Sequence, residues 1–493
     1  MKRIITVILM CMMFLSLFTA CGSKDKVNNS IEDSKEKSTI AAAQVEIEET
    51  LSEVSDINDS ETSTDSPMEE KEGEYGNLRY LIQNGEVIIT DCIMNDIITS
   101  VKIPEAIEGF PVTTIAAYAF DDINGRYLES ISFPETVTKI GVNAFSGTAW
   151  LENKRKENPI VIENNILISW DWTKTYTDVI IPDGVISIAD NAFEDYDDMT
   201  SVTIPNSVMY IGNSAFWNCY DLTNVIMSDN IVEIGTGAFE SCVNLTSITI
   251  PNGAESIGRY AFYKCKNLSD ITITDSVENI GKSAFGECLE VTPWLEEKRK
   301  ENPLVVVNSI VIDGYTCNGD VIIPENITKI ADGAFGGSEL NSITFPDSVV
   351  SIGEEAFSGC DNLSSITIPD GIVSINEWAF SGCDNLSSVT IPDSVVSINQ
   401  SAFFSCNNLS SITIPSSVKN IGLISFAMCE NLKEITFLNP ECEIYPHRST
   451  IYNQKDSDGN LRYDGVIKGY ENSTAQELSL IHISEPTRPI SIS

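Results

Sequence analysis

The hydrophobic and polar positions of this chain repeat with a period of 23 residues. One unit reads NLSSITIPDGIVSINEWAFSGCD, residues 362–384. In its first part Leu363, Ile366 and Ile368 can point to one side, while Ser365 and Thr367 point to the other. The alternation in SITI has the period of two that a β-strand requires. The pattern therefore predicts a short strand with one buried face.

The rest of the unit predicts two further elements. The run GIVSI is a second short extended segment, with Ile372 and Ile375 facing inward. The run NEWAFSGC then predicts a tight helical turn that places Ala379 and Phe380 in the interior. Pro369 has no backbone N–H, so it suits the point at which the first strand leaves its sheet.

An aromatic signature marks each copy of the unit. It is the pair Ala-Phe, or Ser-Phe in the last copy, at Phe120, Phe145, Phe193, Phe216, Phe239, Phe262, Phe285, Phe335, Phe357, Phe380, Phe403 and Phe426. One unit buries too few side chains to offset the entropy of ordering it, so the copies must stack. The sequence thus predicts a repeat solenoid over residues 76–440, with its phenylalanines aligned.

The template L-x-x-I-x-I-P-x-x-V-x-x-I-x-x-x-A-F-x-x-C resembles the BspA-like leucine-rich repeats of bacterial surface proteins. The resemblance covers residues 76–477 and implies a leucine-rich-repeat stack of 23-residue coils, built from short β-strands and helical turns. The segment LRYLIQNGEVIITDC resembles the hairpin that opens such arrays. VIKGYENSTAQE resembles their closing segment, which implies a C-terminal cap at residues 441–477.

Cysteines occupy one position of the repeat and form two ladders. They are Cys219, Cys242, Cys265, Cys288, Cys360, Cys383, Cys406 and Cys429. The family resemblance implies that a Cys at this turn satisfies backbone groups, and a free Cys also packs as a small hydrophobe. Disulfides between coils are an alternative in an exported protein, although parallel Cβ vectors suit that bond poorly. The ladders lack the C-x-x-C spacing of a zinc site, so we expect structural thiols, no metal and no cofactor.

Two similar segments interrupt the period, near residues 148–170 and 292–314. Each predicts a short helix followed by a hairpin, and the second hairpin turns near Asn308 and Ser309. The segments lie 144 residues apart, which indicates duplication of a larger block. Their basic runs, residues 154–156 and 298–300, predict a solvated helix face, with a patch for an anionic ligand as the alternative.

The outward side of the strands predicts a binding surface. Small hydroxyl side chains form columns on a flat, uncharged strip, at Ser365, Thr367, Ser388, Thr390, Ser411 and Thr413. Such strips serve as broad docking surfaces and hold no group for acid–base chemistry. Aromatic residues near the turns are candidate contact residues, or else they pack at the coil edges, at Trp217, Tyr220, Tyr260, Tyr263, Trp378 and Phe404.

Residues 1–21 predict an export signal. Lys2 and Arg3 precede an apolar stretch, residues 4–18, that is too short to span a membrane comfortably. The run LFTACGS then resembles a bacterial lipobox, in which Cys21 is lipidated and becomes the N-terminus, although Phe18 stands where the motif usually has Leu. We expect a lipoprotein on the extracellular face of a bacterial membrane; an ordinary secretion signal is the alternative.

The charge of the chain bounds its partners. Residues 22–75 hold 16 acidic and 5 basic residues, which predicts a disordered acidic tether, with a hidden binding motif as the alternative. The whole chain has a formal net charge of −42, which argues against nucleic acid as a partner. It has only two histidines, so the commonest general base is nearly absent.

The C-terminal residues differ in character from the repeats. LSLIHISEPTR resembles an in-frame translation of a transposase-type sequencing adapter, so we interpret residues 478–493 as an artefact, with a genuine tail as the alternative. His447 is then the one remaining histidine, and nothing near it orients a catalytic triad. DSDGN, residues 456–460, resembles a calcium loop, but Leu461 and Ile467 stand where the EF-hand has Gly and Glu.

These features favour a non-enzymatic protein that binds other molecules at the cell surface. The resemblance implies adhesion, with an extracellular protein or a polysaccharide as the partner. Two alternatives remain open at this point. In the first alternative, the array is the targeting module of an enzyme whose catalytic domain followed residue 477. In the second, it binds carbohydrate through its scattered aromatic side chains.

Overall fold

The computed structural model describes residues 70–93, 98–121, 127–158, 160–170, 175–287, 290–445, 449–455, 461–470, 473–476 and 478. The expected signal, most of the expected tether, Cys288, His447, residues 456–460 and residues 479–493 lie outside the described residues. The chain divides into two compact units, Thr64–Asn302 and the part that begins at Pro303. We call these the N-terminal unit and the C-terminal unit.

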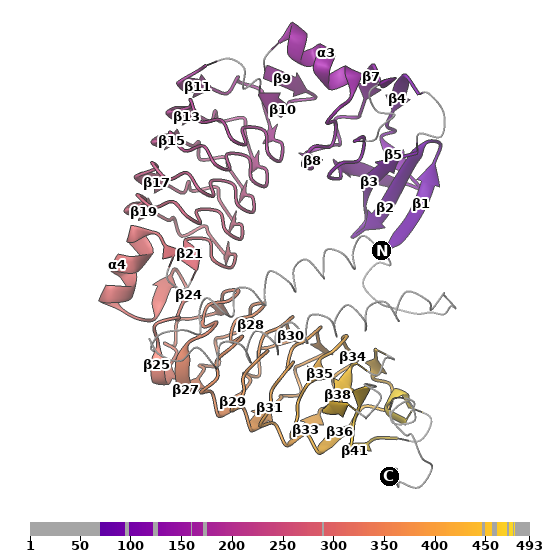
Figure 1. The fold of residues 1–493 in the computed structure, drawn as a ribbon, viewed down its shortest axis with the longest axis vertical. Helices are drawn as coiled ribbons and strands as arrows, with labels where there is room; N and C mark the ends of the chain where they lie inside the picture. Colours follow the sequence, from indigo (N-terminus) through magenta and orange to yellow (C-terminus); the bar gives the residue numbers. More distant parts are fainter. Residues whose placement is uncertain are drawn as a thin grey trace, which may run out of the picture. The chain divides into compact units, whose positions relative to one another are not determined.

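Each repeat contributes one strand to each of two parallel ladders, as the hydrophobic pattern predicts. In one coil the strands are β29 (Ser365–Thr367) and β30 (Ser374–Ile375). Ile366 of β29 and Ile375 of β30 are buried, while Ser365 and Thr367 are exposed. Successive strands lie side by side in Figure 1, for example from β11 to β19.

The N-terminal unit starts with antiparallel strands and continues as parallel ladders. Its first sheet contains β1 (Lys71–Tyr75), β2 (Leu78–Gln83), β3 (Glu86–Cys92), β6 (Phe110–Ile115), β5 (Ala106–Ile107) and β8 (Lys139–Ile140). Its second sheet runs β20 (Asn279–Ile280), β18 (Ser256–Ile257), β16 (Glu233–Ile234), β14 (Tyr210–Ile211), β12 (Ser187–Ile188), β10 (Ile166–Trp170) and β9 (Ile160–Glu163). On the other side of the coils, β4 (Ser100–Lys102) pairs with β7 (Ser130–Ser132), and β17 (Ser247–Thr249) pairs with β19 (Asp270–Thr272). Between them in sequence lies a three-stranded sheet of β11 (Asp178–Ile180), β13 (Ser201–Thr203) and β15 (Asn224–Ile226), and β21 (Gly286–Glu287) pairs with β22 (Glu290–Val291).

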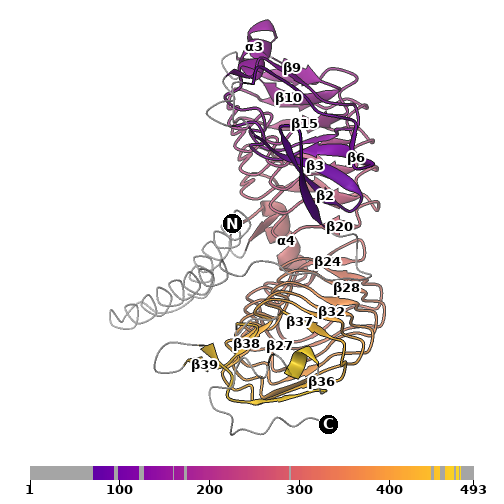
Figure 2. The same cartoon turned by 90° about the vertical axis from the view of Figure 1, so that its right-hand side faces the viewer.

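The C-terminal unit repeats this design. One side of the coils holds two four-stranded sheets, β23 (Val305–Val307), β24 (Ile310–Asp313), β26 (Lys329–Ile330) and β28 (Ser351–Ile352), then β30, β32 (Ser397–Ile398), β34 (Asn420–Ile421) and β37 (Glu443–Ile444). The other side holds the pairs β25 (Asn318–Ile322) with β27 (Glu339–Thr344) and β29 with β31 (Ser388–Thr390), and the sheet of β33 (Ser411–Ile414), β36 (Glu434–Phe437) and β41 (Val466–Lys468). Figure 2 shows β24, β28 and β32 in succession. Two short pairs, β35 (Phe426–Ala427) with β38 (Ile451–Tyr452) and β39 (Gln454–Lys455) with β40 (Leu461–Arg462), complete it.

The phenylalanines of neighbouring coils are stacked, which confirms the predicted alignment. The ring centroids of Phe357 and Phe380 are 5.4 Å apart with an interplanar angle of 3°, and those of Phe380 and Phe403 are also 5.4 Å apart. In the N-terminal unit Phe193 and Phe216 stack at 4.9 Å. A fixed sequence period therefore becomes a fixed position in space, and a ring within a stack, such as Phe380, is packed between two identical rings.

The Ala-Phe segment is a tight hydrogen-bonded turn, as predicted, but its conformation is not helical. The N–H of Ala379 donates to the carbonyl of Asn376 at 3.3 Å, and the N–H of Phe380 donates to Ala402 of the next coil at 2.9 Å. Trp378 has φ +57°, in the left-handed region. An α-helix would direct every N–H back along its own coil. The observed conformation instead directs the Phe380 N–H along the stack, where it satisfies a carbonyl of the neighbouring coil.

Both interruptions have the predicted helix and hairpin. Helix α3 (Ala149–Glu157) begins at Thr148, whose side chain accepts a hydrogen bond from the Leu151 N–H. Strands β9 and β10 follow as an antiparallel pair across Asn164 and Asn165, whose φ values of 47° and 64° fit a type I′ turn. Helix α4 (Pro293–Glu301) ends the N-terminal unit, and the pair β23–β24 begins the C-terminal unit around Asn308.

The expected tether extends too far toward the C-terminus. Residues 71–75 form β1, which pairs with β2 along its whole length, from Lys71 opposite Ile82 to Tyr75 opposite Leu78. The prediction of a longer tether was wrong because strand pairing depends on backbone groups, which amino-acid composition does not report. Strand β1 lies at the edge of its sheet and its side chains are largely exposed, so its composition can be polar. Charged residues suit such an edge, since they discourage pairing with another chain.

The segment expected to cap the C-terminal end contributes further strands to the stack. Strand β37 pairs with β34, β38 pairs with β35, and β41 pairs with β36, all in parallel. Strands β37, β38 and β41 therefore continue the pairing of the coils that precede them.

Candidate interaction surface

The predicted hydroxyl columns lie on the outward side of the C-terminal unit. Ser365 stands opposite Ser388, and Thr367 opposite Thr390, on the paired strands β29 and β31. These four side chains are exposed, as are Ser411 and Thr413 of β33. The columns form because every inward Ile or Val forces its two neighbours outward. The surface is uncharged at these positions and can contact a partner through hydroxyl and methyl groups.

Exposed isoleucines interrupt the threonine columns, and the sequence-based reasoning missed them. Ile180 and Ile226 occupy the threonine position of β11 and β15, on either side of Thr203, and are 71% and 53% exposed. In the C-terminal unit Ile322 holds this position beside Thr344 and is 76% exposed. Aligning the copies by strand register would have revealed them, because an apolar residue then appears at an outward position. We call Ile180, Thr203 and Ile226 of the N-terminal unit the strand-face patch; Ile322 and Thr344 form a similar pair within the C-terminal unit.

A second apolar column lies at the start of the other ladder. In the C-terminal unit Val350 and Val373 are exposed at equivalent positions of successive coils. In the N-terminal unit Ile186 and Met209 hold this position, and the N–H of Met209 donates to the Ile186 carbonyl at 2.8 Å. This column was not predicted from the sequence, because the residue before the Ser-Ile pair of the second strand was assigned neither an inward nor an outward orientation.

The candidate aromatic residues form small groups beside the turns. In the C-terminal unit Trp378 and Phe404, from successive coils, have ring centroids 5.8 Å apart and an interplanar angle of 58°. In the N-terminal unit Tyr260 and Tyr263 lie 5.5 Å apart, also tilted, and the Lys264 ammonium stands 4.8 Å from the Tyr263 ring. Because the paired rings are tilted, each pair presents an edge as well as a face.

Trp217 and Tyr220 differ in their surroundings. Trp217 is half-buried and donates a hydrogen bond to Glu240 of the next coil. Burial raises the pKa of Glu240, while the charge of Lys264 and the bond from Trp217 lower it. Tyr220 is exposed. Trp217 is therefore tied to its neighbouring coil, and Tyr220 presents its ring to the surroundings.

The ladder cysteines have a definite structural contact. The thiol of Cys383 donates to the backbone carbonyl of Phe357, 26 residues earlier in the preceding coil, at 3.1 Å. The same bond recurs at every described ladder position, from Cys219, Cys242, Cys265, Cys360, Cys406 and Cys429. These thiols are free and buried. Burial raises the pKa of the Cys383 thiol well above its usual value, so the thiolate form is disfavoured.

The basic runs of the two helices are mostly paired. On α3, Lys154 forms an ion pair with Glu163 at 2.7 Å, and Arg155 contacts Glu152 at 3.2 Å. On α4, Lys298 pairs with Glu301 and Lys300 with Glu296. These pairs are partly exposed and contribute little to stability. Neither basic run forms a single positive patch, because its three consecutive side chains point in different directions around the helix.

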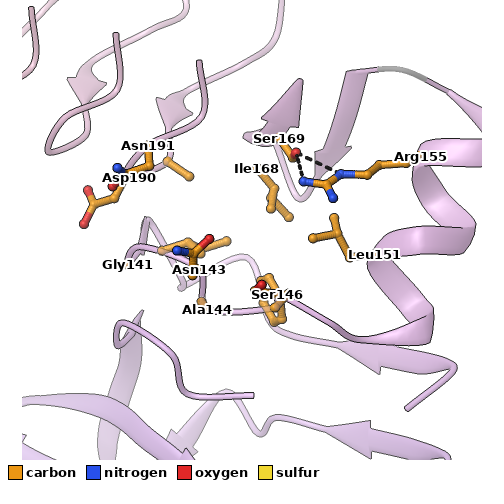
Figure 3. A pocket seen from close by; sticks show the side chains of 13 residues that line it. Gly141, Asn143, Ala144, Ser146, Leu151, Arg155, Ile168, Ser169, Asp190 and Asn191 are labelled. Atoms are coloured by element: carbon orange, nitrogen blue, oxygen red, sulfur yellow. Dashed lines mark hydrogen bonds between the residues drawn. The ribbon is translucent and has the colours of Figure 1, made fainter. Parts of the chain in front are cut away.

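A small cavity lies beside α3 in the N-terminal unit (Figure 3). Its volume is about 70 Å³, and it separates the turn of residues 140–146 from the turn of residues 189–191. Leu151 and Arg155 of α3 and Ile168 and Ser169 of β10 close one side. The nitrogen atoms Nε and Nη2 of Arg155 donate to the Ser169 hydroxyl at 3.2 and 2.7 Å.

No group of three or more His, Cys, Asp or Glu side chains is placed to hold a metal ion in the described part of the chain. None of the helices in the described ranges combines the length and the apolar character needed to cross a bilayer.

The chain matches a family of repeats and resembles several solved structures. The family, described as BspA type Leucine rich repeat region (6 copies), matches residues 86–168, 162–292 and 328–447. A leucine rich cell surface protein from Faecalibacterium prausnitzii is 25% identical over 80% of this chain and 100% of its own, with a TM-score of 0.31. A leucine-rich repeat protein from Bacteroides ovatus is 25% identical over 78% and 93%, with a TM-score of 0.31. The pneumococcal vaccine antigen PcpA is 16% identical over 86% and 98%, with a TM-score of 0.32.

A comparison with curated proteins gave no match. The family match extends over more than half of the chain and includes the coils whose strands and stacked phenylalanines are described above. This chain belongs to the BspA-type leucine-rich repeat family.

Proposed function

We propose that this protein is a non-enzymatic cell-surface scaffold that binds another protein through its strand-face patch. The observation that supports this most directly is the exposure of Ile180 and Ile322 at outward positions where the paired neighbouring strand carries a threonine. The two residues occupy equivalent places, since each ends a DVI strand in its unit, β11 or β25. Large apolar side chains exposed on a flat surface mark protein contact sites more often than sugar sites.

The surroundings of these isoleucines support the same proposal. The side chains of Ser201 and Ser342 donate to the carboxylates of Asp178 and Asp320, both at 2.6 Å, on the strands that carry Ile180 and Ile322. Each isoleucine is thus flanked by a satisfied polar pair. An apolar centre with polar neighbours is the usual composition of a protein interface.

We further propose that the protein is held at the extracellular face of the membrane by a lipid on Cys21. The support is the sequence LFTACGS and the acidic segment that follows it. A tether of this composition would keep the repeats away from the membrane surface. This part of the proposal concerns residues outside the described ranges.

Carbohydrate binding is the second candidate, and the aromatic groups are its basis. Sugar rings stack on exposed, flat aromatic faces, and Trp378 and Phe404 instead present a tilted pair that is half-buried. The protein-binding proposal accounts better for the exposed isoleucines. A glycan array that compares the wild type with Trp378→Ala separates the two candidates.

The test is a binding screen of the purified chain against extracellular proteins, followed by substitution. Ile180→Asp/Ile226→Asp should weaken binding of an identified protein at least tenfold, because it places charges at the centre of the patch. Met209→Asp, in the second apolar column, is the matched control and should leave the affinity unchanged. Binding to glycans alone, or equal loss in both variants, would refute the proposal. A hydrolytic activity of the purified chain would refute its non-enzymatic part.

A further inference from the structure

The cavity beside α3 arises where the first interruption enters the stack. Strand β10 pairs with β12, and the N–H of Trp170 donates to Ala192 at 3.2 Å, in the place of a phenylalanine N–H. Strand β10 thus replaces the strand, and Trp170 the phenylalanine, that a regular coil would contribute to the stack. The turns of the coils before and after it face each other, joined where the Asp190 N–H donates to Ile140 at 3.1 Å, and the cavity lies next to this contact.

Arg155 presents unused donors at this cavity. A guanidinium has five N–H groups. The bonds to Ser169 and Glu152 use three of them, and the other two, one on each Nη, have no partner among the described residues. The Arg155 side chain is 33% exposed, which is less than that of the neighbouring Lys154 on the same helix. Figure 3 shows its guanidinium reaching over Leu151 at the edge of the hollow.

Further polar groups line the same space. Ser146 and Asn143 face it from the opposite turn, and no described residue bonds to either side chain. Asp190 is the acidic residue of the lining, and it is already engaged. Its carboxylate accepts from the backbone N–H and the side-chain amide of Asn213 at 2.7 and 3.2 Å, and Figure 3 shows it directed away from the hollow.

Comparison with the second interruption shows that the first lacks a carboxylate at the position of Ser169. The residues 144 positions after Arg155 and Ser169 are Arg299 and Asp313. The second copy of the sequence therefore has a carboxylate where the first has a hydroxyl. A planar guanidinium matches a carboxylate through two parallel hydrogen bonds, which a single hydroxyl oxygen cannot provide.

We propose that this cavity binds a small free carboxylate of the size of formate or acetate. Its oxygens accept from the two unused N–H groups of Arg155, and Ser146 and Asn143 supply further donors. The volume sets the size limit, because a cavity of about 150 Å³ accepts benzene, with six heavy atoms. A space of about 70 Å³ then holds three or four. The site is separate from the strand-face patch, so it stands or fails independently of the proposed function.

The experiment is a titration of the full chain with acetate, followed by saturation-transfer NMR on the acetate methyl group. Chloride keeps the ionic strength constant. We expect a dissociation constant on the order of 1 mM, as suits a ligand of four heavy atoms. Arg155→Gln should weaken binding at least tenfold. Ser169→Asp should do the same, because it places the protein's own carboxylate against Arg155, and it should raise the melting temperature.

A control variant, chloride and N-acetylglycine test whether acetate binding is specific to Arg155 and to a small free carboxylate. Lys156→Gln removes a neighbouring cation whose amine contacts Asn153, and it should leave acetate binding unchanged. If Arg155→Gln does not fold, the Ser169→Asp variant alone tests acetate binding, because it retains the arginine and changes only its partner. Acetate binding that survives in Ser169→Asp, or that chloride abolishes at equal concentration, would overturn the proposal. N-acetylglycine that binds as tightly as acetate would also overturn it, in favour of a peptide C-terminus.

Discussion

The thiol of Cys383 donates its proton to the backbone carbonyl of Phe357, at a sulfur–oxygen distance of 3.1 Å. Both residues are fully buried. The bond joins one coil to the preceding one at the point where the chain turns, and its repetition along both ladders makes the cysteines part of the backbone hydrogen-bonding scheme. We infer that these thiols help to hold the stack together.

Removing this bond should destabilise the C-terminal unit. We expect Cys383→Ala to lower the free energy of unfolding by about 1–2 kcal/mol, because the Phe357 carbonyl loses one of its two donors, keeping the Cys360 N–H at 3.2 Å, and the missing sulfur leaves a small buried cavity. Chemical denaturation followed by circular dichroism measures the change. Cys317→Ala is the control, since Cys317 is buried outside the ladder and should cost less. Equal effects of the two substitutions would contradict the structural role of the bond.

The buried thiols should also make the protein sensitive to alkaline pH. Burial raises the pKa of Cys360 and Cys429 to about 12, and that of Cys317 to about 11. An unfolded Cys ionises near pH 8.5, so above that value the unfolded state loses protons that the folded state keeps. Each such thiol then removes about 1.4 kcal/mol of stability per pH unit.

This stability is fully present below about pH 8.5 and is lost as the pH rises toward the folded-state pKa values. Melting temperatures measured between about pH 8 and pH 11 check the prediction. A constant melting temperature across this range would show that the thiols are accessible to solvent. Ladder thiols that react with a thiol reagent at pH 8 without unfolding would show the same.

Phenylalanine truncation should separate the interior from the surface at neighbouring positions. Phe380→Ala removes a ring that is packed between Phe357 and Phe403, and should cost about 3–5 kcal/mol. Phe404→Ala removes a half-buried ring one coil further along and should cost about 1 kcal/mol or less. Urea denaturation of both variants gives the comparison. A similar cost for both would mean that the aligned rings do not form the core.

Substitution of Cys21 tests the proposed anchor. Cys21→Ser removes the thiol that would carry the lipid, so the variant should leave the membrane fraction and no longer partition into detergent. The comparison uses detergent-phase separation of cells that express the wild type or the variant. Retention of the variant in the membrane fraction would indicate a different mode of attachment, and incorporation of a labelled fatty acid into the wild type alone would support the lipid.

The stacking of the coils could be predicted because it follows from spacing alone. Phe357, Phe380 and Phe403 recur at a constant interval, and a constant interval in a stacked chain means a constant position. The conformation of the turns could not be predicted in the same way. Trp378 adopts φ +57° because the N–H groups of its turn must reach the neighbouring coil, a requirement that its local sequence does not express.

The candidate sites show the same division. The outward directions of Ser365 and Thr367 follow from alternation, and so do those of the isoleucines once the copies are aligned by register. The position of Arg155 does not. As one of three consecutive basic residues it predicts a solvated helix face, and only the packing of α3 against β10 brings it to Ser169 and the cavity.

The sequence by itself determined the repeat, its family, the buried side of each strand and the places where the period is interrupted. These properties depend on residue order and on the geometry of an extended chain. Tertiary structure alone decided the left-handed turns, the pairing of β1, the thiol–carbonyl bonds between coils and the cavity at α3. Each of these depends on which backbone groups a neighbouring coil leaves unsatisfied, and that is known only after the coils have stacked.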